Sequence, residues 1–216
     1  MWRVCSTLTV TSVAHSKLAR EIAAAATVML KNRRGVLPIL PSGDVKRIAV
    51  IGVWAKTPTV HGGGSNQVTP AYVVSPLQGI TERAPRSGVV EVSFNDGSDL
   101  KSAAAAAGDV DLTVVVVGES SKEGFDRTNL SFSGGQERLV AAVAAASKRS
   151  VVVGINPGPV LLPFEGQVDA VLLMFMPGLE CGHALADILF GDVNPSGRLP
   201  VTIPARENQI GFTTEQ

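Results

Sequence analysis

The chain has 216 residues, which is long enough for one large domain with a sizeable apolar core. Nineteen basic residues balance nineteen acidic ones, so the chain lacks the basic excess of proteins that bind nucleic acids or anionic membranes. Hydrophobic residues make up 45% of the sequence, but they form no run of about 18 that could span a membrane. The histidines and cysteines are scattered without the spacing of metal ligands, so neither a metal nor another cofactor is expected.

The first segment, residues 1–14, is rich in Thr, Ser and Val and differs in composition from the rest of the chain. Hydroxyl residues interrupt its apolar residues too often for a secretory signal peptide, so we predict an irregular leader. A helix is predicted to follow over residues 17–31, with Ser16 as its N-cap. Apolar residues recur at helical spacing in this segment and make a stripe of Leu18, Ile22, Ala25 and Met29.

Strands and helices then alternate along the chain. The predicted strands cover residues 47–53, 89–94, 111–117, 150–155 and 169–175, and the predicted helices cover 75–83, 99–107, 133–148 and 180–189. Ser133 is expected to cap its helix, with Gln136 as the partner in a capping box. This alternation predicts an α/β fold, a three-layer sandwich whose mostly parallel sheet of about five to six strands has helices on both faces. No repeat or linker divides it, so one domain is predicted over residues 15–205, with a polar tail at 206–216.

The most informative stretch begins with four valines, residues 114–117, and continues into a polar segment that we call the acidic loop (residues 119–127). Four β-branched residues in a row favour a strand that is buried on both faces. In open α/β sheets, reactive groups lie in the loops just after the carboxyl ends of the strands. The acidic loop contains Glu119, Glu123 and Asp126, and a carboxylate in a glycine-flanked loop can act as a general acid/base. Glu123 is the candidate, whereas Asp126 beside Arg127 is interpreted as half of a structural ion pair.

A second candidate loop follows the first core strand, and we call it the glycine turn (residues 62–65). Its three glycines expose backbone N–H groups and allow close approach of a ligand or of another loop, although a flexible turn is the alternative interpretation. The glycines do not follow the G-x-G-x-x-G order of a dinucleotide site, and the chain contains no Walker loop and no G-x-S-x-G nucleophile elbow.

These segments together resemble the C-terminal α/β sandwich domain of family 3 glycoside hydrolases, the β-glucosidase and β-xylosidase group, over roughly residues 15–205. Residues 123–127 resemble the family's E-G-x-D-R segment, and the glycine turn with the helix after it resembles the family's glycine-rich loop. The most specific blocks are residues 177–180, Pro-Gly-Leu-Glu, and residues 184–200, which end in Asn-Pro-Ser-Gly-Arg-Leu-Pro. Residues 131–133 and 181–183 depart from the family's usual pattern.

The resemblance implies that Glu123 is the general acid/base of a retaining, β-glucosidase-like mechanism that hydrolyses O-glycosyl bonds. It implies that the nucleophile is an aspartate in a (β/α)8-like barrel domain, so a barrel partner in cis or in trans is expected, with a β-linked glucoside or oligosaccharide as substrate. The residues that the resemblance implies in substrate binding are Gly63, Gly64, Ser65, Asp126 and Arg127. Without the nucleophile, this chain alone is expected to show little or no turnover.

Two other functions compete with this one. A non-catalytic carbohydrate-binding or protein-binding sandwich domain would present its barrel-facing surface as an exposed apolar patch. A flavodoxin-like nucleotide or phosphate binder is disfavoured, because no phosphate-cradling loop is recognised at a helix N-terminus. The sugar specificity is not determined by this sequence, since most sugar contacts in the family belong to the barrel.

Overall fold

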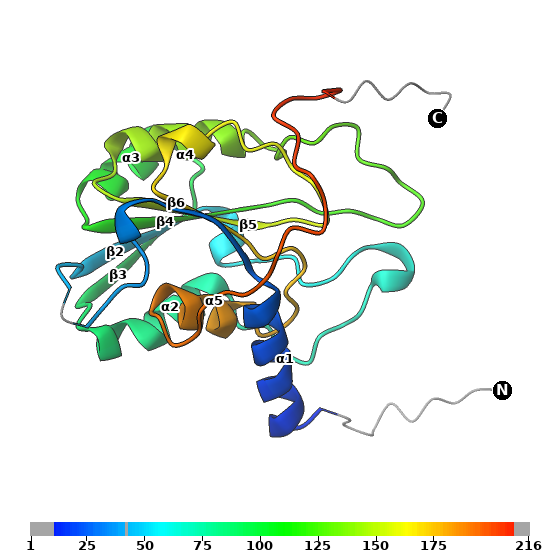
Figure 1. Ribbon diagram of the computed structural model, residues 1–216, viewed down its shortest axis with the longest axis horizontal. Helices are drawn as coiled ribbons and strands as arrows, with labels where there is room; N and C mark the ends of the chain where they lie inside the picture. The colour runs from blue at the N-terminus through cyan, green and yellow to red at the C-terminus, as the bar shows by residue number, and fades with distance from the viewer. Residues whose placement is uncertain (1–10, 42, 210–216) are drawn as a thin grey trace.

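The computed structural model describes residues 11–41 and 43–209, and within them a six-stranded sheet lies between two layers of helices (Figure 1). The strands are β1 (Val28–Asn32), β2 (Arg47–Ile51), β3 (Glu91–Asn95), β4 (Leu112–Gly118), β5 (Ser150–Ile155) and β6 (Ala170–Leu173). The α-helices are α1 (Val13–Ala26), α2 (Pro76–Arg83), α3 (Leu100–Gly108), α4 (Gln136–Ala146) and α5 (Cys181–Leu189). The strand order is β1-β6-β5-β4-β2-β3, and only the β1–β6 pair is antiparallel among these described strands. The predicted α/β sandwich with a mostly parallel sheet is therefore confirmed.

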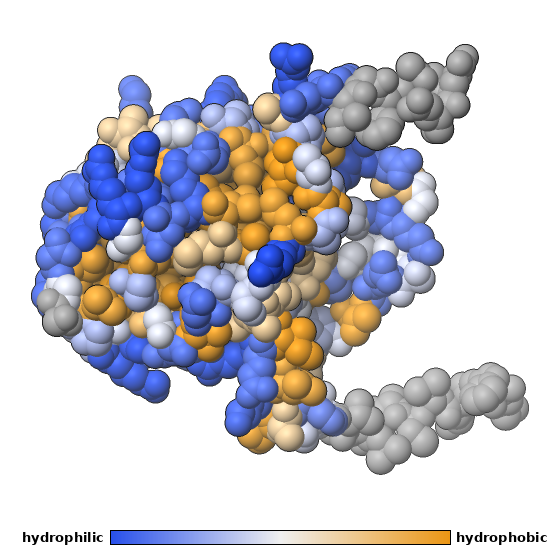
Figure 2. Space-filling model, in the orientation of Figure 1, coloured by the Kyte–Doolittle hydropathy of each residue, from blue (hydrophilic) through white to orange (hydrophobic). Residues whose placement is uncertain are grey.

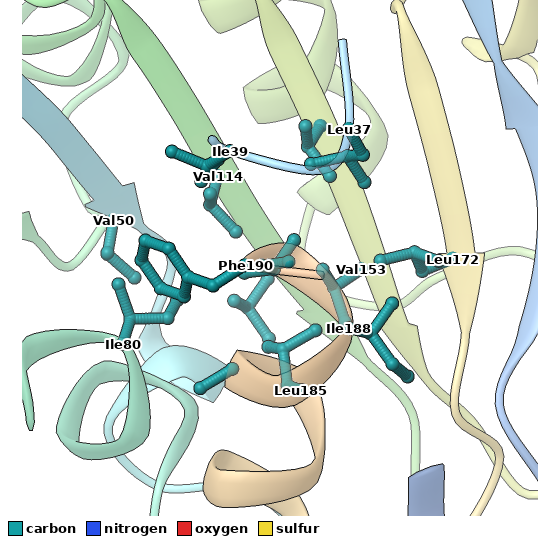
Figure 3. Close-up of a cluster of buried hydrophobic side chains, with 14 of the residues drawn as sticks. Leu37, Ile39, Val50, Ile80, Val114, Val153, Leu172, Leu185, Ile188 and Phe190 are labelled. Atoms are coloured by element: carbon teal, nitrogen blue, oxygen red, sulfur yellow. The ribbon is translucent and has the colours of Figure 1, made fainter. Parts of the chain in front are cut away.

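The valine run of β4 contributes to both apolar layers. Val114 and Val116 point into a cluster shared with α2 and α5, part of which Figure 3 shows around Ile80, Leu185 and Phe190. The intervening Val115 and Val117 point to the opposite face, into a cluster shared with α3 and α4. Side chains alternate between the two faces of a strand, so an uninterrupted apolar run needs cover on both faces. That requirement places β4 in the interior of the sheet.

The N-terminal helix differs from the prediction at both ends. Helix α1 begins at Val13, and the Ser12 side chain, not that of Ser16, accepts its capping hydrogen bond from the His15 N–H group at 3.3 Å. The helix ends at Ala26, and the following residues pair with β6 as strand β1. Residues 13 and 14 of the predicted leader thus belong to a helix, and residues 1–10 lie outside the described residues. Local helix propensity is weak enough for such strand pairing to override it.

The large residues of the apolar stripe on α1 lie on an open surface. Leu18 is 53% exposed and Ile22 is 58% exposed, whereas Ala23 and Ala24 are buried in the apolar cluster that α1 shares with α5. Figure 2 shows apolar residues along the projecting part of this helix. The larger side chains therefore lie on an open surface, and the small alanines allow α1 to approach its neighbours closely.

Helix caps decide how the other helices begin. Ser75 caps α2 by accepting from the Gln78 N–H group at 3.2 Å, at the start of the helix predicted over residues 75–83. Helix α4 begins instead after Gly135, which has a left-handed backbone, and the predicted Ser133 cap is wrong. The Gln136 side chain binds the backbone N–H and C=O groups of Gly118, both at 2.8 Å. The start of α4 is thereby tied to the end of β4, next to the acidic loop.

Candidate active site

Two neighbouring parallel strands bring the two candidate loops to one edge of the sheet. Strand β2 pairs with β4, so the glycine turn that follows β2 and the acidic loop that follows β4 leave in the same direction. Figure 1 shows both segments extending from this end of the sheet. Gly118 ends β4 where a side chain has no room, because a Cβ atom there would lie 2.1 Å from the Trp54 ring. The absence of a side chain at Gly118 therefore allows β4 to end directly beneath Trp54.

The glycine turn and the acidic loop hydrogen-bond to each other. The Gly63 N–H group donates to the Ser121 carbonyl at 3.0 Å, and the Glu123 N–H group donates to the Gly63 carbonyl at 3.3 Å. Gly63 and Lys122 form an isolated parallel bridge. Of the two interpretations of the glycines, close approach of another loop is the one that the structure adopts. The turn is bonded to the acidic loop and is not a free flexible connection.

Glu123 extends from the acidic loop onto the glycine turn. Its Oε2 atom accepts a hydrogen bond of 2.7 Å from the Ser65 N–H group, and the residue is exposed. Hydrogen bonding from Ser65, through its side chain and its backbone, lowers the pKa of the Glu123 carboxyl below its ordinary value. In this arrangement Glu123 is an ionised carboxylate at neutral pH, and a general acid requires a higher pKa.

The other two carboxylates of the acidic loop have different surroundings. Glu119 accepts from the backbone N–H groups of Ser120 at 3.0 Å and Ser133 at 2.8 Å, so it holds the segment that leads into α4. Asp126 is exposed, and among the described residues it forms no ion pair with Arg127. The predicted ion pair is therefore wrong. Arg127 reaches away from Asp126 and donates through Nη1 to a backbone carbonyl after β5, that of Pro159, at 2.8 Å.

A shallow depression of about 520 Å³ lies beside the paired loops. Gly63, Asp126 and Arg127 line it, together with His61, Gln67 and Phe125, which the sequence did not single out. The Phe125 side chain is 66% exposed, and Lys122 Nζ lies 4.6 Å from the centre of its ring. An aromatic residue within an otherwise polar loop is the sequence signal that could have identified Phe125, since such rings normally lie in the apolar core.

Metal-ion and thiol chemistry lack suitable groups in the part of the chain that the structure describes. No cluster of three or more His, Cys, Asp or Glu residues there could hold a metal ion. Burial raises the pKa of the Cys181 thiol to about 12, which leaves it unreactive as a nucleophile at neutral pH. Within the same residues, none of the helices has the length and apolar character needed to cross a bilayer.

The sheet order and the paired loops define an α/β sandwich domain whose candidate site is an open surface at the carboxyl edge of the sheet. The Glycosyl hydrolase family 3 C-terminal domain matches residues 27–216, and the chain belongs to this family. The resemblance recognised in the sequence is thereby confirmed.

Several family members share this domain. Thermostable beta-glucosidase B of Acetivibrio thermocellus is 40% identical over 208 residues, which cover 89% of this chain and 27% of that protein. The exo-alpha-(1->6)-L-arabinopyranosidase of Bifidobacterium breve is 34% identical over 206 residues, which cover 88% of this chain and 27% of that protein. A family 3 beta-glucosidase structure from Neurospora crassa superimposes with a TM-score of 0.85 at 32% identity, over 94% of this chain and 27% of that one. The chain thus spans about a quarter of the length of these proteins.

Proposed function

We propose that this chain supplies the general acid/base carboxyl, Glu123, to a retaining active site that hydrolyses β-linked glucosides or oligosaccharides. The observation that carries the proposal is the exposed Glu123 carboxylate, which is held at the sheet edge by the Ser65 N–H group. In a retaining mechanism one carboxyl protonates the leaving oxygen and later activates water, while a second carboxylate about 5–5.5 Å away attacks the sugar. Glu119 is an unsuitable second carboxylate, because two backbone N–H groups already hold it.

The nucleophile in this proposal is an aspartate of a (β/α)8-like barrel domain that covers the carboxyl edge of the sheet. The Glu123 carboxylate is exposed in this chain, and burial beneath a second surface would disfavour its charged form and raise its pKa towards the range that a general acid requires. Gly63, Asp126 and Arg127 line the depression and are proposed to contact the sugar. Gly64 and Ser65 are proposed to act at the same site through Glu123, which both of them contact.

The sugar specificity is proposed to be set outside this chain. One relative is named a beta-glucosidase and another an arabinopyranosidase, and both match nearly the same share of this chain. A shared acid/base domain is compatible with different sugars, because proton transfer involves the glycosidic oxygen and not the hydroxyl groups that distinguish the sugars.

The test is hydrolysis of aryl β-glucosides and β-xylosides by the purified 216-residue chain, alone and mixed with a separately produced family 3 barrel domain. We expect little or no turnover by the chain alone, recovery on mixing, and loss of the recovered activity in Glu123→Gln. Glu119→Gln is the matched control, since it neutralises a carboxylate of the same loop that the proposal leaves out of the chemistry.

Substrates with different leaving groups test the acid role of Glu123 specifically. A dinitrophenolate group leaves without being protonated, so Glu123→Gln should lower kcat/KM, which reports the step that forms the glycosyl-enzyme, much less for a dinitrophenyl glucoside than for an alkyl glucoside. Equal losses for the two substrates would remove Glu123 from the acid role. Turnover by the chain alone that Glu123→Gln abolishes would show that the nucleophile lies within this chain.

A second candidate function is a non-catalytic interaction domain. The exposed apolar face of α1, with Val13 at 89%, Leu18 at 53% and Ile22 at 58% exposure, supports it, because extended apolar surface marks an interaction site. The mixing experiment separates the two candidates. Association with a barrel domain without any recovered hydrolysis would favour the interaction domain.

A further inference from the structure

The glycine turn touches Glu123 at several points, and these contacts exceed what a simple chain reversal requires. The Gly63 carbonyl accepts a hydrogen bond from the Glu123 N–H group at 3.3 Å, and the Ser65 N–H group donates to Glu123 Oε2 at 2.7 Å. Between them, Gly64 lies directly against the glutamate, because a Cβ atom there would lie 2.7 Å from Glu123 Cβ and 3.0 Å from Oε2. Backbone and side chain of one acidic residue are thus both held by one short turn.

From these contacts we propose that Gly64 and Ser65 are positioning residues that hold the Glu123 carboxylate in one orientation. The proposal rests on the proposed function for its catalytic meaning, but the holding contact itself is independent of any turnover. Gly64 has a φ of 76°, a conformation that residues with side chains rarely adopt, and any side chain there would push Glu123 away. Gly64 therefore leaves room for the Glu123 side chain, and the Ser65 N–H group binds its carboxylate.

The contact has a consequence for the acid role. A backbone N–H group stabilises the charged carboxylate more than the neutral acid, so the hydrogen bond from Ser65 favours the ionised form. A glutamate that donates its proton to a leaving oxygen has to be protonated first. The Ser65 contact must therefore weaken or break when Glu123 becomes an acid, and it can form again when the carboxylate acts as a base.

The first test uses the unchanged chain. The Glu123 carboxyl carbon and the Ser65 amide proton are followed by NMR through a pH titration. We expect the Ser65 amide signal to shift with the same midpoint as the Glu123 carboxyl, and this shift to vanish in Glu123→Gln. A Ser65 amide signal that does not move with Glu123 would overturn the proposal.

The second test removes the donor. Ser65→Pro has no backbone N–H group, whereas Ser65→Ala keeps the N–H group and loses only the hydroxyl. We expect the Glu123 pKa to rise in both variants and to rise further in Ser65→Pro. A Glu123 pKa in Ser65→Pro that equals that of Ser65→Ala would show that the N–H group does not hold the carboxylate. Dispersed amide signals from β4 and β5 would establish that each variant is folded.

The two proposals fail differently. If the Ser65 and Glu123 signals titrate together but Glu123→Gln keeps full activity in the mixing experiment, the holding contact stands and the acid/base assignment falls. If Glu123→Gln abolishes activity but the Ser65 signal is independent of Glu123, the assignment stands and the positioning role falls.

Discussion

Replacing Gly182 with alanine should force α2 and α5 apart and destabilise the domain. The two helices approach so closely at this point that a Cβ atom on Gly182 would lie 2.0 Å from the Ser75 carbonyl oxygen. The reciprocal contact is equally close, because a Cβ atom on Gly79 would lie 2.0 Å from the Gly182 oxygen. The Gly182 N–H group also donates to the Val74 carbonyl at 2.9 Å. The obstructing atoms all belong to the backbone, so no side-chain rotation can relieve the overlap.

The cost follows from these distances. Real Cβ atoms essentially never approach other heavy atoms within 3.0 Å, so the segments must move apart by about 1 Å. Overpacking of this kind costs up to about 3 kcal/mol, and the strained hydrogen bond costs about 1 kcal/mol more. Alanine recovers about 1 kcal/mol through its higher helix propensity. The expected net loss is about 3 kcal/mol, or roughly 6–12 °C in Tm for a chain of this length.

Urea and thermal unfolding followed by circular dichroism would measure this loss. Gly166→Ala is the matched control, because a Cβ atom at Gly166 would meet nothing within 4 Å. We expect the control to change the free energy of unfolding by less than about 0.5 kcal/mol. If Gly182→Ala unfolded at the wild-type temperature, helix propensity would outweigh the contact, and the reasoning from close approach would be wrong.

The remaining two predictions concern pH dependence and the core. Partial burial lowers the pKa of His183, but hydrogen bonds to Glu82 and Glu180 outweigh it and raise that pKa. His183 should therefore stabilise the fold fully below its unfolded pKa of about 6.5 and lose this contribution as pH rises through its folded pKa. The variant His183→Gln should lower the urea midpoint in acid and hardly at all in alkali. A loss of stability that grows with pH would contradict this prediction. Val115 is buried, so Val115→Ala should lower the free energy of unfolding in urea by about 2 kcal/mol. Val90→Ala, at a position that is 79% exposed, should change it by almost nothing. Equal losses in the two variants would refute the burial argument.

Much of the fold and part of the candidate site could be predicted from local sequence signals. The valine run of β4 identified a strand buried on both faces, and the helices predicted over residues 75–83 and 99–107 correspond to α2 and α3, which Ser75 and Asp99 cap. Glu123 and the glycine turn were selected separately, each from its composition and its position after a strand. These signals are local because rotamer stiffness, capping geometry and glycine φ angles act within a few residues.

The tertiary structure alone decided the features that depend on distant partners. Residues 28–32 form a strand because β6, about 140 positions later, offers them an edge, so the helix predicted there ended early. Arg127 donates a hydrogen bond to the Pro159 carbonyl in another loop and, among the described residues, forms no ion pair with its neighbour Asp126. The hydrogen bond from Ser65 to Glu123 exists because β2 and β4 are adjacent in the sheet although β3 lies between them in the chain. Composition and residue spacing do not determine that strand order. The order follows from how the apolar faces of all the strands and helices are buried together.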